Sequence, residues 1–398
     1  MPDQASQGRQ SRQGHAVKWA VPIAAVVLVA GAIASGPVIA AVQGDPVLPE
    51  RTAEQLLADA AQATRSGLKP MSGTVMQTAS FGLPGLPAVS GMGGSSPVAL
   101  LAGSHELKVW YGGANQVRLA LPGRMSETDL IVNGDQAWLW ESEANKATRI
   151  KVDAQAAQAR AGEAQQAQKA LPTATTPQQL AQELLKETGA DTVVSVTNTE
   201  KVADRAAYQL VLAPKDGSSL VKEVRLALDG ETLVPLRIQV YAKSAAEPAF
   251  EVGFTSVTFT PPSADNFTFT PPAGSKVVEE KPLDALAAAE RAKAEQKGAE
   301  GLREKVRTVG DGWTTVAVLP FSAQDLKGQT PKEQGGPGGQ DANAIVDALL
   351  KSAKPISGTW GSGKVIQTKL VSALLTDDGR LLVGAVTPEK LAEAAGQK

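Results

Sequence analysis

Cysteine is absent from this chain of 398 residues, and other reactive side chains are scarce. Without cysteine the chain has no disulfide, no thiolate ligand for zinc, no thiol nucleophile and no cysteine for lipid attachment. Histidine occurs only twice, as His15 and His105, and the formal net charge is only -2. A charge so close to zero gives no general attraction to nucleic acid. The composition therefore excludes thiol chemistry and predicts no nucleic-acid partner.

The residues that remain do not predict catalysis. A Ser-His-Asp triad beyond the N-terminal region would have to use His105, and the chain contains no G-x-S-x-G elbow. No D-x-D-x-D-G calcium loop occurs. The stretch "GTWGSGKV" (residues 358–365) has the spacing of a phosphate-binding loop, but Val365 stands where Ser or Thr would bind the metal. We therefore predict a tight turn there, and we expect no catalytic residue, no metal site, no cofactor and no enzymatic activity.

An uncharged stretch near the N-terminus is the clearest local signal. Residues 20–42 carry no charge, and a helix of this length just crosses a hydrocarbon core of about 30 Å. Arg9, Arg12 and Lys18 precede it, which predicts a cytoplasmic tail at 1–19 and an extracytoplasmic location for the rest. Two interpretations stay open: an uncleaved signal anchor, or a signal peptide with a small-residue cleavage site at 32–34. We favour the anchor in the cytoplasmic membrane, because the apolar run continues to Val42.

Helices are predicted at two places in the following region. After a linker at 43–50, "TAEQLLADAAQATRSG" places Leu56 and Ala60 at helical spacing. "TPQQLAQELLKETG" (residues 176–189) has Thr at the cap, Pro at the first position and Gly after the end. The Ala/Gln-rich residues 153–176 between the strands and this second helix are expected to be an exposed helix or a disordered insertion.

Apolar residues at period two predict antiparallel hairpins over most of the chain up to residue 270. Leu226 and Ile238 are in phase in two strands that carry polar residues on the opposite face, as in a sheet with one solvated side. The alternation shifts by one residue after Phe254, which predicts a bulge near Thr255 and Ser256. Prolines at 271 and 272 cannot donate to a ladder, so "FTFT" just before them is predicted as the last strand.

Aromatic and apolar residues in two places have both a structural and a functional interpretation. Trp138 and Trp140 share one face of a strand, and Trp110 lies on a neighbouring hairpin. In the structural interpretation they pack in the core or form an exposed aromatic ridge. In the functional interpretation they are part of a surface that binds a lipid or a partner. The Gly/Pro-rich loop at 81–92 carries Phe81, Leu83 and Leu86, and it is either a lid over an apolar cavity or a loosely packed loop.

The order of these pieces resembles the LolA-like superfamily of bacterial envelope proteins. The pieces are "TAEQLLADAAQ", "SGTVMQT", "VADRAAYQLVLAPKDG", "VRLALDGETLVPLRIQVY" and "FTFTPPAGSKV", within residues 50–280. The superfamily includes lipoprotein carriers, lipid-binding LppX/LprG-type proteins and MucB/RseB-type regulators, and the chain looks most similar to exported actinobacterial members. The resemblance implies an α+β fold in which an incomplete antiparallel β-barrel, a half-barrel, encloses helices around an apolar ligand.

These observations give the following expectations. Residues 50–280 form the lipid-binding domain, 281–308 a polar helical linker, and 309–398 a small C-terminal extension of strands and helices. The function is to hold a lipid, an acyl chain or a lipoprotein outside the cytoplasm. The alternative is an envelope-stress sensor that contacts a membrane anti-sigma factor. The expected ligand-binding residues are Phe81, Leu83, Leu86, Trp110, Trp138, Trp140, Leu226, Ile238 and Phe254.

Overall fold

The computed structural model describes residues 47–65, 67–82, 102–123, 125–151, 191–280, 306–321 and 351–397. The predicted membrane segment at 20–42 and the predicted helix at 176–189 lie outside these ranges. Within the described ranges, no helix is both long enough and apolar enough to cross a bilayer. Attachment to the membrane through the N-terminal segment therefore stays a prediction.

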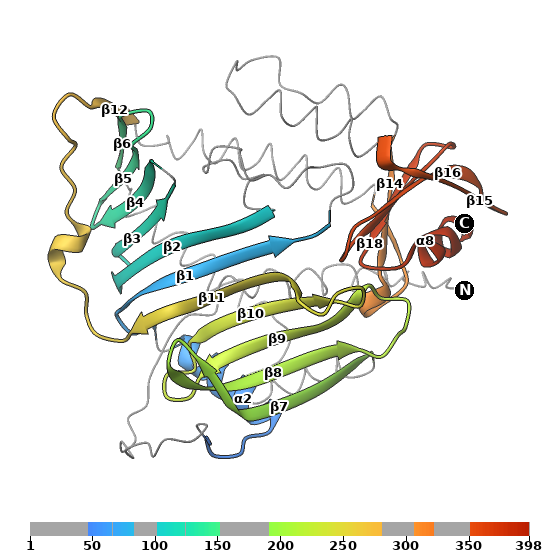
Figure 1. The fold of residues 1–398 in the computed structure, drawn as a ribbon, viewed down its shortest axis with the longest axis horizontal. Helices are drawn as coiled ribbons and strands as arrows, with labels where there is room; N and C mark the ends of the chain where they lie inside the picture. Colours follow the sequence, from blue (N-terminus) through green and yellow to red (C-terminus); the bar gives the residue numbers. More distant parts are fainter. Residues whose placement is uncertain are drawn as a thin grey trace, which may run out of the picture.

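One large sheet dominates the structure (Figure 1). Its strands are β1 (Met71–Ser80), β2 (Ala102–Gly113), β3 (Gln116–Pro122), β4 (Glu127–Asn133), β5 (Gln136–Glu141), β6 (Lys146–Lys151), β7 (Thr192–Val202), β8 (Arg205–Pro214), β9 (Val221–Asp229), β10 (Pro235–Ala242), β11 (Pro248–Thr258) and β12 (Lys276–Glu280). The order across this twelve-stranded sheet is β12-β6-β5-β4-β3-β2-β1-β11-β10-β9-β8-β7. All neighbours are antiparallel except β12 and β6, which are parallel. Since β12 and β7 do not pair, the sheet is open. The open, mostly antiparallel sheet of the predicted fold is confirmed, whereas a half-barrel that encloses helices stays a prediction.

Helix α2 (Ala53–Arg65) covers one end of this sheet. Thr52 Oγ1 accepts from the Gln55 amide at 3.1 Å, and Gln55 Oε1 accepts from the Thr52 amide at 3.0 Å. This reciprocal capping box satisfies two donors that a helix start leaves free. Leu56 packs on Tyr208 and Leu228, and Leu56 and Tyr208 are fully buried. The main core of the large sheet therefore lies between α2 and strands β7 to β9.

The C-terminal strands form a second sheet with its own core. They are β13 (Arg307–Val309), β14 (Val316–Pro320), β15 (Lys354–Gly358), β16 (Gly361–Gln367), β17 (Ser372–Thr376) and β18 (Arg380–Gly384), followed by helix α8 (Pro388–Gly396). Their order is β13-β14-β18-β17-β16-β15. Leu374, Leu382 and Leu391 are fully buried between this sheet and α8. The "GTWGSGKV" stretch forms the β15–β16 hairpin, so the predicted tight turn is confirmed.

The two sheets meet in a seam at one end of the large sheet. The amide of Leu220 donates to the carbonyl of Ala385 at 2.8 Å. Trp313 Nε1 donates to Thr192 Oγ1 at 2.8 Å. The buried apolar residues of the seam are Val221, Ala242, Ala249 and Leu370. Backbone pairing and a shared apolar cluster therefore join the second sheet to the large one.

Two details of the strand predictions have different outcomes. The bulge in β11 is confirmed, because Thr74 pairs with Ser256 and Val75 with Phe254, so the register between β1 and β11 skips Thr255. The "FTFT" strand is wrong. Phe267 ends the 3-10 helix η3 (Ala264–Phe267), and the following residues up to 275 form no strand. Proline pairs stand on both sides of this segment and lack the N–H groups that a ladder needs.

The predicted helical linker at 281–308 differs from the structure at its C-terminal end. Its N-terminal bound follows directly on β12, which ends at Glu280 and pairs with β6. Arg307 and Thr308 belong to β13, which pairs with β14. Pairing with β14 decides the conformation of these two residues, and the polar composition of the segment did not reveal it. The rest of this segment, residues 281–305, lies outside the described ranges.

Candidate apolar binding surface

The strand register separates the large sheet into two faces. Residues paired directly across antiparallel strands lie on the same face. Leu210 pairs with Leu226, Leu226 with Ile238, and Ile238 with Val252. Leu210 belongs to the cluster under α2, so we call this side the α2 face. Val252 pairs with Gln77, which carries the α2 face onto β1.

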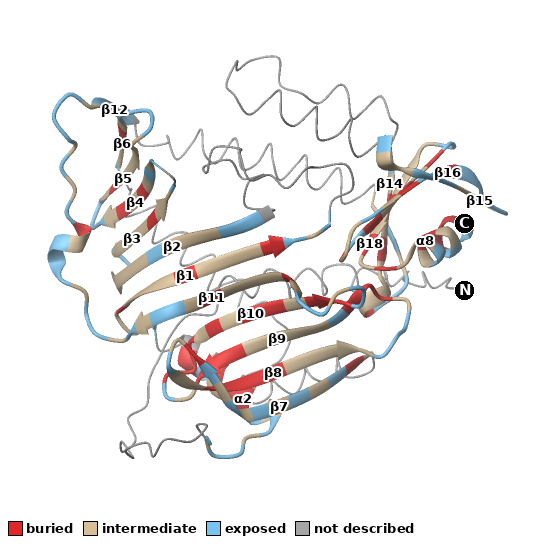
Figure 2. Cartoon of the chain, viewed as in Figure 1, coloured by how far each residue is buried: buried red, intermediate tan, exposed pale blue. Residues whose placement is uncertain are grey.

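The α2 face continues onto strands β2 to β6, which together with β12 we call the wing. The register runs from Val109 through Leu119 and Leu130 to Leu139. We define the wing surface as the apolar residues of this face: Leu107, Val109, Tyr111, Val117, Leu119, Leu130, Val132 and Leu139. These residues are half-buried, whereas the strands below α2 carry fully buried ones (Figure 2). The wing surface is thus an apolar extension of the core face that is incompletely covered.

Two hydroxyl groups lie in this apolar setting. Burial raises the pKa of the Tyr111 phenol above its ordinary value, so Tyr111 stays neutral at all ordinary pH values. Thr148 pairs with Leu139 and is buried, and its hydroxyl has no hydrogen-bond partner among the described residues. A buried hydroxyl without a partner is uncommon in folded proteins. It gives the wing surface a polar group next to its apolar side chains.

The opposite side of the wing, which we call the strap face, carries a ladder of aromatic and basic residues. The Arg118 guanidinium lies 5.2 Å from the ring centre of Trp110, and that of Arg149 lies 5.7 Å from that of Trp138. Stacking of this kind contributes about 0.5–1 kcal/mol at partly exposed sites. Arg149 also forms an ion pair with Glu279 of β12 at 3.4 Å. The ladder therefore helps to hold the edge strand in place.

Residues 259–275, which we call the strap, run across this face from β11 to β12 (Figure 1). Phe269 lies 5.5 Å from Trp138 and 5.9 Å from Trp140, measured between ring centres. Phe267 is buried, and a Cβ atom on Gly112 would lie only 3.0 Å from its ring. The strap thus packs closely on the wing and gives this thin part of the sheet a second, smaller core.

A buried carboxylate lies on the strap face. Asp129 is 3% exposed and accepts from Arg118 Nη2 at 2.5 Å. Burial and then a hydrogen bond with Glu127 raise the pKa of Asp129 to about 6, although Arg118 opposes the shift. Asp129 Oδ1 has no partner among the described residues. The group is therefore ionised at neutral pH but takes up a proton in mildly acidic solution.

The structure does not bring the predicted ligand-binding residues together. Trp110, Trp138 and Trp140 lie on the strap face, opposite to Leu226 and Ile238. The tryptophans are thus packing partners of arginines and of the strap, which was one of the two interpretations.

The remaining predicted residues lie in other clusters. Leu226 packs in the α2 cluster, and Ile238 is buried. Phe254 packs on the cluster that contains Ala227 and Leu236. Phe81 stacks on Phe250 at 6.3 Å in the seam, and Leu83 and Leu86 lie outside the described residues. The binding roles of these residues stay predictions.

The predicted ligand-binding residues do not include the wing surface, although its signal is present in the sequence. Val109, Val117 and Leu119 are in phase in two neighbouring strands, whose opposite face carries Trp110 and Arg118. The tryptophans were chosen by residue type, and a shift of one residue places a side chain on the other face. Counting the alternation from Val109 instead of Trp110 would have selected the α2 face.

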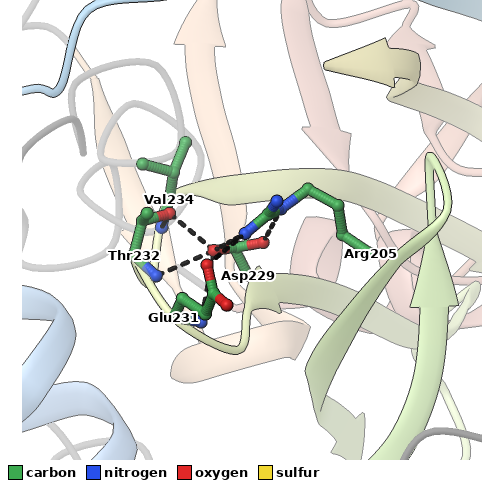
Figure 3. Close-up of polar contacts among 5 residues, drawn as sticks. All are labelled: Arg205, Asp229, Glu231, Thr232 and Val234. Carbon is green, nitrogen blue, oxygen red and sulfur yellow. Dashed lines mark hydrogen bonds and ion pairs between the residues drawn. The ribbon is translucent and has the colours of Figure 1, made fainter. Parts of the chain in front are cut away.

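A buried polar turn fixes the β9–β10 hairpin at the α2 end of the sheet (Figure 3). Asp229 is fully buried, and its Oδ1 accepts from the amide and the hydroxyl of Thr232, both at 2.8 Å. Arg205 forms an ion pair with the same carboxylate and a second one with Glu231 at 2.9 Å. Paired in this way, the buried charge is satisfied. The "LDGETLVP" motif therefore has a structural role, which is to lock the turn.

Comparisons with known proteins point to the bacterial envelope. A family model described as "Predicted periplasmic protein (DUF2092)" matches residues 96–279. No curated protein matches the chain. The match covers most of the large sheet, and the description of that family agrees with an extracytoplasmic location.

Several solved structures are similar to the chain. The MucA/MucB complex of Pseudomonas aeruginosa has 13% identity, covers 86% of this chain and 96% of that one, and gives a TM-score of 0.37. A LolA-superfamily protein of Nitrosomonas europaea has 11% identity; the match covers 50% of this chain and 90% of that one, with a TM-score of 0.19. A putative outer membrane lipoprotein-sorting protein domain of Vibrio parahaemolyticus has 11% identity; the match covers 55% of this chain and 97% of that one, with a TM-score of 0.20. These matches include a member of the LolA superfamily, which the sequence resembles. TM-scores below 0.5 are too low to carry over a ligand or a partner.

Proposed function

We propose that the chain is an extracytoplasmic, non-enzymatic binding protein, tethered by its N-terminal segment, that holds an apolar ligand on the wing surface. The ligand class is a lipid, an acyl chain or the acyl group of a lipoprotein. The observation that carries the proposal is the continuity of the α2 face. The same apolar face that packs on α2 extends, incompletely covered, over Val109, Leu119 and Leu130. The open sheet then acts as the half-barrel that the family resemblance implies.

The energy available from such a surface fits this role. Moving a methylene group from water to an apolar environment is worth about 0.8 kcal/mol, so an acyl chain with about ten buried methylenes gains about 8 kcal/mol before the costs of ordering. No catalytic group is needed for this. The hydroxyls of Thr148 and Tyr111 lie on the same face, four strands apart, and either of them can hydrogen-bond to an ester carbonyl at the polar end of such a ligand.

Lipid analysis of the purified full chain tests the proposal. We expect native mass spectrometry to show a co-purified lipid, and a fluorescent fatty acid to bind with saturation. Val109→Glu places a charge on the wing surface and should weaken probe binding at least about tenfold, since a carboxylate loses hydration there. Lys108→Glu, an exposed change on the other face of the same strand, is the matched control and should leave binding unchanged. Absence of lipid together with absence of probe binding would overturn the proposal.

A second candidate function is regulation through a membrane partner such as an anti-sigma factor. The seam favours it, because a simple lipid carrier has no need of a second sheet joined through Leu220, Trp313 and Leu370. Chemical crosslinking in intact cells distinguishes the two. A stoichiometric membrane regulatory protein on the chain, without bound lipid, would favour regulation over ligand carriage.

A further inference from the structure

The edges of the two sheets differ in how well they are protected from pairing with other strands. Proteins commonly block such edges with charges, prolines or short strands. Within the described ranges, β12 has five residues and includes Lys276 and Glu279, and β13 has only three residues. β15 contains Lys354 and Pro355. β7 is different, because its 11 residues include no charge, proline or glycine before Glu200.

Among the residues that the structure describes, few backbone groups bond to the outer side of β7. The amide of Lys215 donates to the carbonyl of Asp191 at 2.9 Å, so the backbone N–H and C=O groups of Asp191 point inward to β8. Since these groups alternate in direction along a strand, the backbone N–H and C=O groups of Val194 and Val196 point to the outer side of β7. Within the described ranges, the outer side of β7 accepts only one backbone hydrogen bond, from Leu48 to the carbonyl of Asn198 at 3.0 Å.

Leu48 shows that this edge already accepts an extended chain. Besides its amide bond to Asn198, its carbonyl accepts from Asn198 Nδ2 at 2.5 Å. The contact lies beside the irregularity between Thr197 and Glu200, where the register with β8 shifts. The outer positions from Val193 to Thr197 continue directly from this contact.

Side chains on this part of β7 define what the edge can accept. Val194 and Val196 pack against the α2 cluster on one face. On the other face Ser195 and Thr197 are exposed. Val193 lies on this face too and is 52% exposed, whereas few large apolar side chains in the described ranges are exposed to this extent. An added strand would therefore meet an apolar strip on one face and small or neutral side chains on the other.

We propose that the outer edge of β7 at residues 193–197 binds an extended segment of another protein as an additional strand. Backbone hydrogen bonds from Val194 and Val196 hold the segment, and the contact continues the one made by Leu48. The partner segment is uncharged, contains no proline, and has apolar residues at alternate positions, in keeping with the rules of strand addition. This site lies at the edge of the sheet and binds protein, so it is independent of the apolar ligand on the wing surface.

Selection from a displayed library of random peptides on the full chain tests the proposal. We expect enriched peptides with alternating apolar residues and no proline. Val196→Pro removes an outward N–H without touching the ladder to β8, and proline is tolerated at such edge positions. It should weaken binding of the selected peptides about tenfold, as the loss of one hydrogen bond predicts. Val196→Thr keeps the N–H and is the matched control, with unchanged affinity.

A second variant guards against misfolding of the first. Ser195→Lys adds a charge at an exposed position and keeps the backbone hydrogen bonds to β8. It should weaken binding of the same peptides, while the melting temperature stays that of the wild type. Failure to enrich alternating peptides would overturn the proposal, as would equal affinity for wild type and Val196→Pro. A dimer of the chain that Val196→Pro abolishes would assign the edge to a second copy and overturn it too.

Discussion

The β7–β9 region of the large sheet and the wing are built from strands with the same alternation of apolar and polar residues, but they are covered in different ways. The α2 helix packs on the first region and buries Tyr208 and Leu228 completely. The wing has its closest packing on the opposite side, where the strap covers the ladder around Trp138. The comparison teaches that alternation sets which residues share a face, whereas the covering segment decides which of the two faces becomes core.

The largest expected effect is on the core below the strap. Phe267→Ala removes a buried ring that packs on Gly112, so we expect the free energy of unfolding to fall by about 3–5 kcal/mol. Amide hydrogen exchange should increase first in β12 and β6, which the strap ties together. Phe269→Ala, whose ring lies between two half-buried tryptophans, should cost less. If amide hydrogen exchange in Phe267→Ala increased equally in all strands of the large sheet, the wing would not have a separate core.

The core below α2 should respond to truncation in a similar range. Leu56→Ala leaves a cavity against Tyr208, and such changes cost about 2–5 kcal/mol. Urea unfolding measures the loss. Leu57→Ala on the same helix is the control, since Leu57 is only partly buried and should cost less. A smaller loss for Leu56→Ala than for Leu57→Ala would show that α2 packs differently on the sheet.

Asp129 should make the stability of the wing depend on pH. Its folded-state pKa of about 6 exceeds the ordinary value of 3.8, so the folded protein holds a proton that the unfolded chain releases between these values. The free energy of unfolding should therefore fall as pH rises from about 4 to 6, by an amount on the order of 2 kcal/mol. Asp129→Asn should lose this fall in denaturant titrations at a series of pH values. An unchanged pH profile in the variant would assign the effect to another group.

The smallest effect on stability is expected on the wing surface. Leu119→Ala shortens a half-buried side chain, so it should cost less than about 1 kcal/mol in unfolding. Binding of a fluorescent fatty acid should nevertheless weaken severalfold, because each lost methylene contact removes about 0.8 kcal/mol. If stability fell as far as in Leu56→Ala, the wing surface would be core and the proposed ligand site would be lost.

Much of the sheet could be predicted from the sequence, because alternation and turn residues are local signals. The register of Leu226 and Ile238, the bulge at Thr255 and the turn after Gly358 all follow from them. The strap could not be predicted in this way. Its phenylalanines alternate with threonines as in a strand, and only the distant partners Trp138 and Trp140 show that Phe269 is an anchor. The predicted ligand-binding residues fall on both faces of the sheet for the same reason, because residue type does not reveal which face a side chain occupies: Trp138 and Trp140 lie on the strap face, whereas Leu226 and Ile238 lie on the α2 face.

The position of β1 has a consequence for how the chain folds. β1 lies in the middle of the sheet and pairs on one side with β11, where Ser72 meets Thr258. Most other neighbours in the sheet are hairpins that close over short loops, so they are expected to form early. The β1–β11 pairing must close a loop of most of the domain, and such contacts are slow to form. Until it forms, the wing and the β7–β11 region are two separate sheets with two exposed central edges.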